Sequence, residues 1–169
     1  KSETFLTMNP LGKVPVIDDD GFILYESNAI IRYLARKNKS PLYPRKVDKQ
    51  ALTDQWCDFL ANFLNPGITQ IMFNRIIAPN HGMPSSEEEI KKGEEVVAMA
   101  LPIINNQLRK SRYIAGRTFT IADISATAIM EAIEPLRLDM KPYKKINKWL
   151  ERSRGMDFYQ RFQAEMPAP

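Results

Sequence analysis

The sequence predicts a short α/β segment followed by an all-α domain. Three observations support this: two β-prone runs around an Asp-Gly turn near the N-terminus, a proline-containing stretch after them, and an apolar period of about 3.6 residues in the remainder. Of the 169 residues, 44% are hydrophobic and 26% charged, which is typical of a globular protein. The expected division is residues 1–37, a linker over residues 38–47, and a helical domain over residues 48–169.

The first segment reads as strand, turn, strand and helix. Residues 14–17 and 22–25 are short apolar runs, and the Asp-Asp-Asp-Gly sequence between them favours a β-hairpin. A helix is expected over residues 27–35, because their apolar side chains fall on one helical face. Ser27 is the N-cap candidate for that helix.

The second segment begins with a long helix. An apolar stripe extends from Leu52 to Met72, and Pro66-Gly67 within it predicts a break or bend. Residues 78–85 contain two prolines, a glycine and the histidine, so a loop is expected there.

Helix signals continue to the end of the chain. Ser86 and Glu89 have the spacing of a capping box, and Pro102 should kink the helix that follows them. Further helices are expected from Thr120, over residues 141–152, and as a short turn near residues 157–162.

Composition argues against several classes of function. The net charge is +4 and the pI near 9.2, but the basic-rich segment over residues 137–154 has helical spacing, so we interpret it as the solvated face of a helix, without nucleic-acid binding. No apolar run approaches the roughly 18 residues of a membrane span, and no signal peptide is evident, which favours a cytoplasmic protein.

The few reactive side chains have structural interpretations. One cysteine, Cys57, and one histidine, His81, argue against a disulfide framework and a metal site. We expect Cys57 to pack in a helix and His81 to be a solvated loop residue. The chain starts at Lys1 without a methionine, which favours part of a longer protein over the alternative, a truncated product.

The first candidate site is the loop from Asn9 to Pro15. A proline in the second position of a strand cannot donate to a ladder, so Pro15 is consistent with an ordinary edge strand. If the Val14–Pro15 bond is cis, Val14 can instead offer its N–H and C=O to an extended peptide. The loop sequence alone leaves both interpretations open.

The second candidate site is Glu26-Ser27, at the junction of a strand and a helix. A helix N-terminus offers unpaired N–H groups and a partial positive charge, so with the Ser27 hydroxyl it suits a carboxylate, while Glu26 can neutralise an ammonium group. Together they fit the headgroup of an α-amino acid. The alternative is a helix cap without a ligand.

The combination of these motifs resembles the cytosolic glutathione transferase family. The pattern is Asn-Pro-x-Gly-Lys-Val-Pro, then Glu-Ser-Asn-Ala-Ile before a helix, then a proline-rich linker and an all-helical half. The segment from Ile114 to Ile124 is similar to the family's buried-helix signature. The resemblance implies part of a thioredoxin-like domain followed by an all-α domain, usually as a homodimer, and is closest to the theta-like and bacterial branch.

The resemblance also implies roles for the candidate residues. Val14, before a cis Pro15, would pair its backbone with the cysteinyl part of glutathione. Glu26 and Ser27 would hold the amino and carboxylate groups of the γ-glutamyl residue, and Lys13 would reach the glycyl carboxylate. Glutathione is then the co-substrate, an apolar electrophile is the partner, detoxification is the expected role, and no metal is required.

Thr120 and Asp123 are interpreted as structural residues. They have the spacing of a capping box, in which Thr120 is the N-cap and Asp123 returns a hydrogen bond to its backbone. Phe119 and Ile124 have the spacing of a hydrophobic staple around that box.

The predicted activity is conjugation of the glutathione thiolate to electrophilic apolar substrates. The family's first strand, first helix and second strand have no counterpart in this sequence, so the Ser, Tyr or Cys that activates the sulfur is expected upstream of Lys1. Activity of this chain alone therefore stays open. A non-catalytic binding or scaffolding module of the same family is the alternative, and a plain helical interaction domain is a third possibility.

Overall fold

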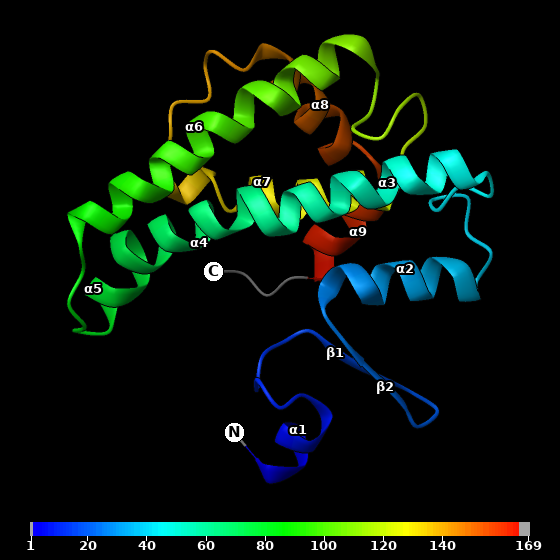
Figure 1. The fold of residues 1–169 in the computed structure, drawn as a ribbon, viewed down its shortest axis with the longest axis horizontal. Coiled ribbons are helices and arrows are strands. Elements are labelled where there is room, and N and C mark those ends of the chain that lie inside the picture. Colours follow the sequence, from blue (N-terminus) through cyan, green and yellow to red (C-terminus); the bar gives the residue numbers. More distant parts are fainter. Residues whose placement is uncertain (1, 166–169) are drawn as a thin grey trace.

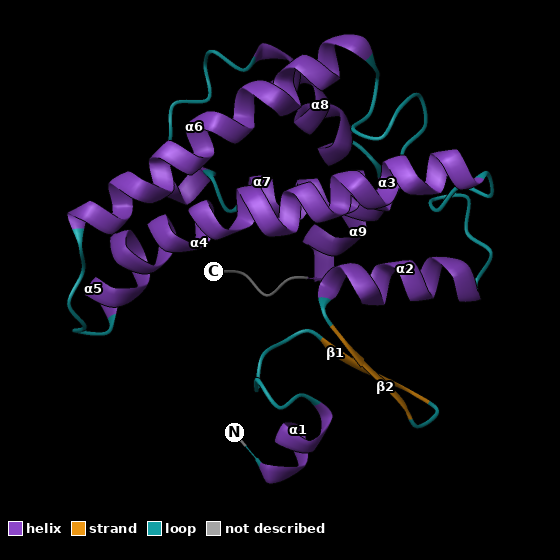
Figure 2. Cartoon of the chain, viewed as in Figure 1, coloured by secondary structure: helices purple, strands orange, loops and turns teal. Residues whose placement is uncertain are grey.

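The computed structural model describes residues 2–165. A hairpin between two helices forms the first part of the molecule, and a bundle of helices forms the rest (Figure 1; Figure 2). The elements are, in order, α1 (Glu3–Met8), β1 (Val16–Asp19), β2 (Phe22–Tyr25), α2 (Ser27–Lys37), α3 (Val47–Phe59), η1 (Leu60–Leu64), α4 (Asn65–Met72), η2 (Phe73–Ile77), α5 (Ala78–Asn80), α6 (Glu87–Lys110), α7 (Ile121–Glu131), η3 (Glu134–Leu136), α8 (Lys144–Arg154) and α9 (Asp157–Glu165).

The predicted hairpin is confirmed. β1 and β2 pair antiparallel, from Val16 opposite Tyr25 to Asp19 opposite Phe22. Asp20 and Gly21 between them both have positive φ, at 54° and 87°, as a two-residue type I′ turn requires. The first strand begins at Val16, later than predicted, because the residues before it form a loop. The short helix α1 was not predicted.

The N-cap of α2 is Glu26, so the prediction that Ser27 caps this helix is wrong. Glu26 has a φ of 72°, and its carbonyl oxygen accepts the first helical hydrogen bond, from the N–H of Ile30 at 2.9 Å. The backbone therefore turns one residue earlier than the sequence suggested, and Ser27 is the first helical residue. Ile30 and Ala35 form the buried side of α2.

The helical elements are continuous through residues 47–80, so of the break or bend predicted at Pro66-Gly67, a break does not occur. A π-helical turn, η1, lies directly before α4. Pro66, which has no N–H to donate, is the second residue of α4. A second π-helical turn, η2, leads into α5, so the expected loop begins at His81 and not at residue 78.

Helices α4 and α6 pack closely at a pair of glycines. A Cβ on Gly67 would lie 2.9 Å from the carbonyl oxygen of Gly93, and a Cβ on Gly93 would lie 2.7 Å from the carbonyl oxygen of Gly67. These distances are too short for a side chain at either position. The two glycines therefore set how closely the helix axes approach.

Only half of the capping box predicted at α6 forms. The Ser86 hydroxyl accepts from the N–H of Glu89 at 3.3 Å, but the N–H of Ser86 donates to Oδ1 of Asn74 at 3.0 Å. Glu89 is instead hydrogen-bonded to Gln70 and Lys92. The helix continues through Pro102 as one element to Lys110.

The capping box predicted at α7 is confirmed. Thr120 is the N-cap, its side chain accepts from the N–H of Asp123, and the Asp123 carboxylate accepts from the Thr120 N–H at 2.9 Å. The same carboxylate accepts from the Ile114 N–H and from Nε1 of Trp149, both at 2.9 Å. Asp123 thus joins the start of α7, the preceding loop and α8.

The core lies around α7, between α3, α4, α6 and α8. α8 begins at Lys144, three residues later than predicted, because Lys141 belongs to a turn in which its N–H donates to Asp139. Ile146 and Trp149 are buried, so the interpretation of the basic segment as an amphipathic helix is confirmed.

The terminal turn predicted near residues 157–162 is a full helix, α9. Among residues 2–165, no helix is long and apolar enough to cross a bilayer.

Candidate functional site

The two candidate sites lie at the same end of the hairpin. Val16 pairs with Tyr25, so the residues just before β1 and just after β2 are neighbours across the hairpin. Val14-Pro15, before β1, and Glu26-Ser27, after β2, therefore lie at the same end of the hairpin, near the start of α2. Pairing of the strands makes one site of two motifs that are about ten residues apart in the sequence.

The loop before β1 exposes a backbone segment. The Val14–Pro15 bond is cis, and Val14 is 80% exposed. Within residues 2–165 the N–H and C=O of Val14 have no hydrogen-bond partner. Both backbone groups are therefore free to pair with a bound peptide, as the second interpretation of this loop required.

Asn9 holds the loop in this shape, a role that the sequence analysis did not assign. Its side chain is almost completely buried: Nδ2 donates to the carbonyl oxygen of Lys13 at 2.8 Å, and Oδ1 accepts from the N–H of Leu11 at 3.1 Å. An Asn that bonds to the backbone of its own loop is a common turn signal. The motif contained that signal, but only the structure shows that it reaches Lys13.

The start of α2 supplies the polar groups of the site. Glu26 and Ser27 are both exposed, and neither side chain makes a hydrogen bond or salt bridge among the described residues. The first N–H groups of a helix have no partner within it, so they point outward with a partial positive charge. An anionic group is favoured beside Ser27, and a cationic group beside the Glu26 carboxylate.

Lys13 lies one residue before the exposed backbone of Val14. Its side chain is exposed, and within the described part of the chain its ammonium group makes no salt bridge. It can therefore pair with an anionic group of a ligand that extends along the loop. Among the described residues, no hydrogen bond or salt bridge joins the Lys13 side chain to α2, so a ligand could connect the loop with the helix.

Ser27 also borders a small cavity of about 210 Å³ between α2, η1 and α7. Its polar lining consists of Ser27, Asn28, Asn65 and Ser125. Asn28 donates from Nδ2 to the carbonyl oxygen of Cys57 at 3.0 Å, across 29 residues of sequence.

Ionic contacts hold α2 to its neighbours. Arg32 pairs with Asp54 and Asp58 of α3, at 2.7 Å in each case. Tyr33 donates to Asp19 of β1 at 2.6 Å. Hydrogen bonds from Lys37 and then Tyr33 lower the pKa of Asp19 below its ordinary value of 3.8. The ion pairs of Arg32 and the hydrogen bond of Tyr33 join segments that are far apart in the sequence, so no local sequence pattern predicted them.

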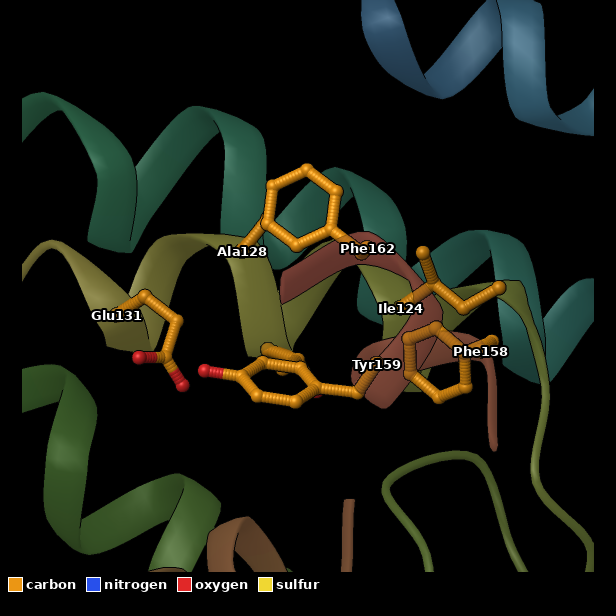
Figure 3. Close-up of a pocket in the computed structure, with 7 residues that line it drawn as sticks. Ile124, Ala128, Glu131, Phe158, Tyr159 and Phe162 are labelled. Carbon is orange, nitrogen blue, oxygen red and sulfur yellow. The ribbon is translucent and has the colours of Figure 1, made fainter. Parts of the chain in front are cut away.

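A larger, mainly apolar cavity of about 320 Å³ lies between α7 and α9 (Figure 3). Ile124 and Ala128 line it and also line the small cavity near Ser27, so the two cavities adjoin. Phe158, Tyr159 and Phe162 of α9 close its other side. Residues 72–77, at the end of α4 and in η2, line neither cavity.

The cysteine and the histidine lie outside this site. Cys57 is fully buried, and burial raises the pKa of its thiol to about 12, so it is packing, as predicted. His81 is an exposed loop residue whose Nδ1 contacts the carbonyl oxygen of Ile77 at 2.9 Å. Within residues 2–165, no cluster of three or more His, Cys, Asp or Glu side chains is suited to a metal ion.

Comparison with known families identifies two matching regions. Residues 1–37 match the model described as "Glutathione S-transferase, N-terminal domain". Residues 64–155 match the model described as "Glutathione S-transferase, C-terminal domain".

Individual proteins agree with these matches. Glutathione S-transferase F10 of Arabidopsis thaliana is 34% identical over 124 residues, covering 72% of this chain. The chain spans 58% of the length of that curated relative.

Two solved structures share the fold. The structure of a glutathione S-transferase-I bound with lactoylglutathione is 27% identical, with a TM-score of 0.86 over 98% of this chain and 80% of that one. A glutathione S-transferase of Pseudomonas fluorescens is 30% identical, with a TM-score of 0.80 over 93% of this chain and 77% of that one.

Proposed function

Because the chain belongs to the glutathione S-transferase family, we propose that it binds glutathione at the hairpin end and serves its conjugation to apolar electrophiles. The observation that carries this proposal is that the unpaired backbone of Val14 and the open start of α2 at Ser27 lie at the same end of the hairpin. The Val14 backbone can pair with an extended peptide, and the start of α2 fits an α-amino acid headgroup. Glutathione contains both.

Each part of the tripeptide has a complementary group. The γ-glutamyl carboxylate fits the Ser27 hydroxyl and the first N–H groups of α2, where the helix dipole favours an anion. The ammonium group fits the free carboxylate of Glu26. The cysteinyl backbone fits the N–H and C=O of Val14 next to Pro15, and Lys13 reaches the glycyl carboxylate.

The proposed chemistry is nucleophilic attack by sulfur. The thiol of glutathione loses its proton, and the thiolate forms a bond to an electrophilic carbon, from which a leaving group departs when the reaction is a substitution. A free thiol has a pKa of about 8.5, so positioned donors must stabilise the thiolate near neutral pH. In this proposal the five residues above hold the tripeptide, and sulfur activation is assigned to none of them.

Calorimetric titration of the protein with glutathione tests the binding site. Replacing Ser27 by alanine should weaken binding by about 1 to 3 kcal/mol, because a carboxylate is left without its hydroxyl partner. The matched control is Ser125→Ala, which removes a hydroxyl from the same small cavity but from α7. Equal affinity of Ser27→Ala and wild type would refute the role of Ser27.

Turnover separates the proposed enzyme from the alternative, a non-catalytic binding or scaffolding module. Both would be retained on immobilised glutathione, so retention does not discriminate. Formation of a glutathione adduct from a chloronitroarene, followed by absorbance, is expected of the enzyme only. Binding without adduct formation would favour the scaffolding role.

The finer features of the proposal concern class, organisation and assembly. The sequence suggested the theta-like and bacterial branch, but the plant relatives support the phi class, which we propose instead.

We retain the division of the chain into residues 1–37, a linker over residues 38–47 and a helical domain over residues 48–169. Helix α2 ends and α3 begins close to these limits. We also propose a detoxifying homodimer in the cytoplasm, which sedimentation and cell fractionation can test.

A further inference from the structure

Within residues 2–165, one side-chain hydrogen bond joins the first turn of α2 to the helical domain, and Asn28 makes it. This residue directly follows Ser27, and its amide Nδ2 donates to the carbonyl oxygen of Cys57 at 3.0 Å. The two residues are 29 positions apart, one in the segment over residues 1–37 and the other in the helical segment from residue 48 onward. The bond therefore joins the first turn of α2 to the end of α3.

The acceptor lies where the long helix changes its hydrogen-bond pattern. The N–H of Leu60 is shared between the carbonyl oxygens of Trp56 and Cys57, and the π-helical turn η1 follows. A backbone carbonyl oxygen has two lone pairs, so it can accept from a second donor. The Cys57 carbonyl is thus available to a side chain from outside α3.

The other end of the Asn28 amide is unsatisfied. Its Oδ1 is buried and has no hydrogen-bond partner within residues 2–165. A buried acceptor without a partner is destabilising, whereas an apolar side chain of similar shape would bury no such group. The donor side of the amide is therefore the feature that accounts for an Asn at this position.

Resting on the proposed function, we propose that Asn28 is a positioning residue for glutathione binding. Its amide holds the first turn of α2, and with it the Ser27 hydroxyl and the outward N–H groups, against the backbone of α3. A small displacement of these donors would spoil their alignment with a carboxylate. By linkage, bound glutathione would in turn stabilise the segment around Cys57.

The test compares two substitutions in the same interface. Asn28→Ala removes the amide, adds no charge and introduces a better helix former, so a loss of affinity cannot be attributed to helix propensity. Arg32→Gln is the matched control: it removes the ion pairs to Asp54 and Asp58 one turn further along α2 and leaves Asn28 intact. Both proteins are titrated with glutathione by calorimetry, and their amide hydrogen exchange is followed with and without glutathione.

We expect Asn28→Ala to raise the Kd for glutathione about tenfold, which corresponds to about 1.4 kcal/mol, and Arg32→Gln to stay within twofold of wild type. Glutathione should slow exchange over residues 56–61 in wild type and in Arg32→Gln, but not in Asn28→Ala. A merely structural role would not produce this difference. The inference is overturned if Asn28→Ala binds within twofold of wild type, or if Arg32→Gln loses as much affinity.

The same experiment separates this inference from the proposed function. If wild type does not bind glutathione, the proposed function fails and the positioning role falls with it. If wild type binds and only the Asn28 result is negative, the proposed function stands and this inference alone is refuted.

Discussion

Replacing Asp123 by alanine should destabilise the fold strongly without affecting glutathione binding. The carboxylate is buried and accepts from the N–H groups of Ile114 and Thr120 and from Nε1 of Trp149. Alanine leaves all three donors without this partner. Within residues 2–165, none of these donor groups is hydrogen-bonded to a residue of the proposed glutathione site.

The magnitude follows from the three donors. A buried donor that loses its partner costs about 1 to 3 kcal/mol. Burial raises the pKa of Asp123 despite the hydrogen bonds it accepts, so removing the carboxylate also removes a desolvation penalty, and the lower end of that range applies. We therefore expect a loss of about 3 to 5 kcal/mol in the free energy of unfolding. For a chain of this size, that loss lowers Tm by about 6 to 20 °C.

Circular dichroism during thermal and urea unfolding measures the loss, and calorimetry measures the affinity for glutathione. The control is Asp139→Ala, which removes an exposed aspartate that accepts a single hydrogen bond, from the N–H of Lys141 at 3.0 Å. It should change stability by less than about 1 kcal/mol. A loss below about 1 kcal/mol for Asp123→Ala, or a weaker affinity with unchanged Tm, would refute the structural role.

Three further predictions concern stability and reactivity. Gly93→Ala should lower the free energy of unfolding by about 1 to 3 kcal/mol, although alanine favours helices, because its methyl group would lie 2.7 Å from the carbonyl oxygen of Gly67. Urea unfolding measures this loss, and a variant as stable as wild type would contradict it. Asp19→Asn should destabilise the protein at neutral pH but not in acid. The hydrogen bond from Lys37 lowers the pKa of Asp19 in the folded protein below its ordinary value of 3.8. The Asp19 carboxylate therefore stabilises the fold above pH 3.8, and this stabilisation is lost as the pH falls through the lower pKa of the folded state. Urea midpoints across this pH range decide it, and a difference that persists in strong acid would refute it. The Cys57 thiol, with a pKa raised by burial to about 12, should resist iodoacetamide at mildly alkaline pH until guanidinium unfolds the chain; rapid alkylation of the folded protein would exclude this burial.

The sequence was sufficient wherever the determining residues lie close together in the chain. The Asp20-Gly21 pair specified the hairpin because only a few residue types tolerate two successive positive φ values. Thr120 and Asp123 specified the start of α7 because a capping box is complete within four residues. The candidate site residues were found for the same reason, since each belongs to a short motif.

Local signals failed where a distant group competed for the same atoms. Ser86 and Glu89 have the spacing of a capping box, but the N–H of Ser86 bonds to Asn74. The N-cap of α2 is Glu26 and not Ser27, because the turn out of β2 places the positive φ one residue earlier. In the first case a distant side chain determined the outcome, and in the second the adjoining turn after β2 did.

By itself, the sequence determined the hairpin, the helical half, the family resemblance and the residues proposed to hold glutathione. Only the tertiary structure decided that Val14 and Ser27 share one end of the hairpin, that Gly67 and Gly93 let two helices approach, and that Asn28 bonds to Cys57. The physical reason is how far apart in the sequence the interacting groups lie. Turns and caps are fixed by torsion angles and hydrogen bonds within a few residues, whereas these contacts exist only after distant segments have packed and excluded water between them.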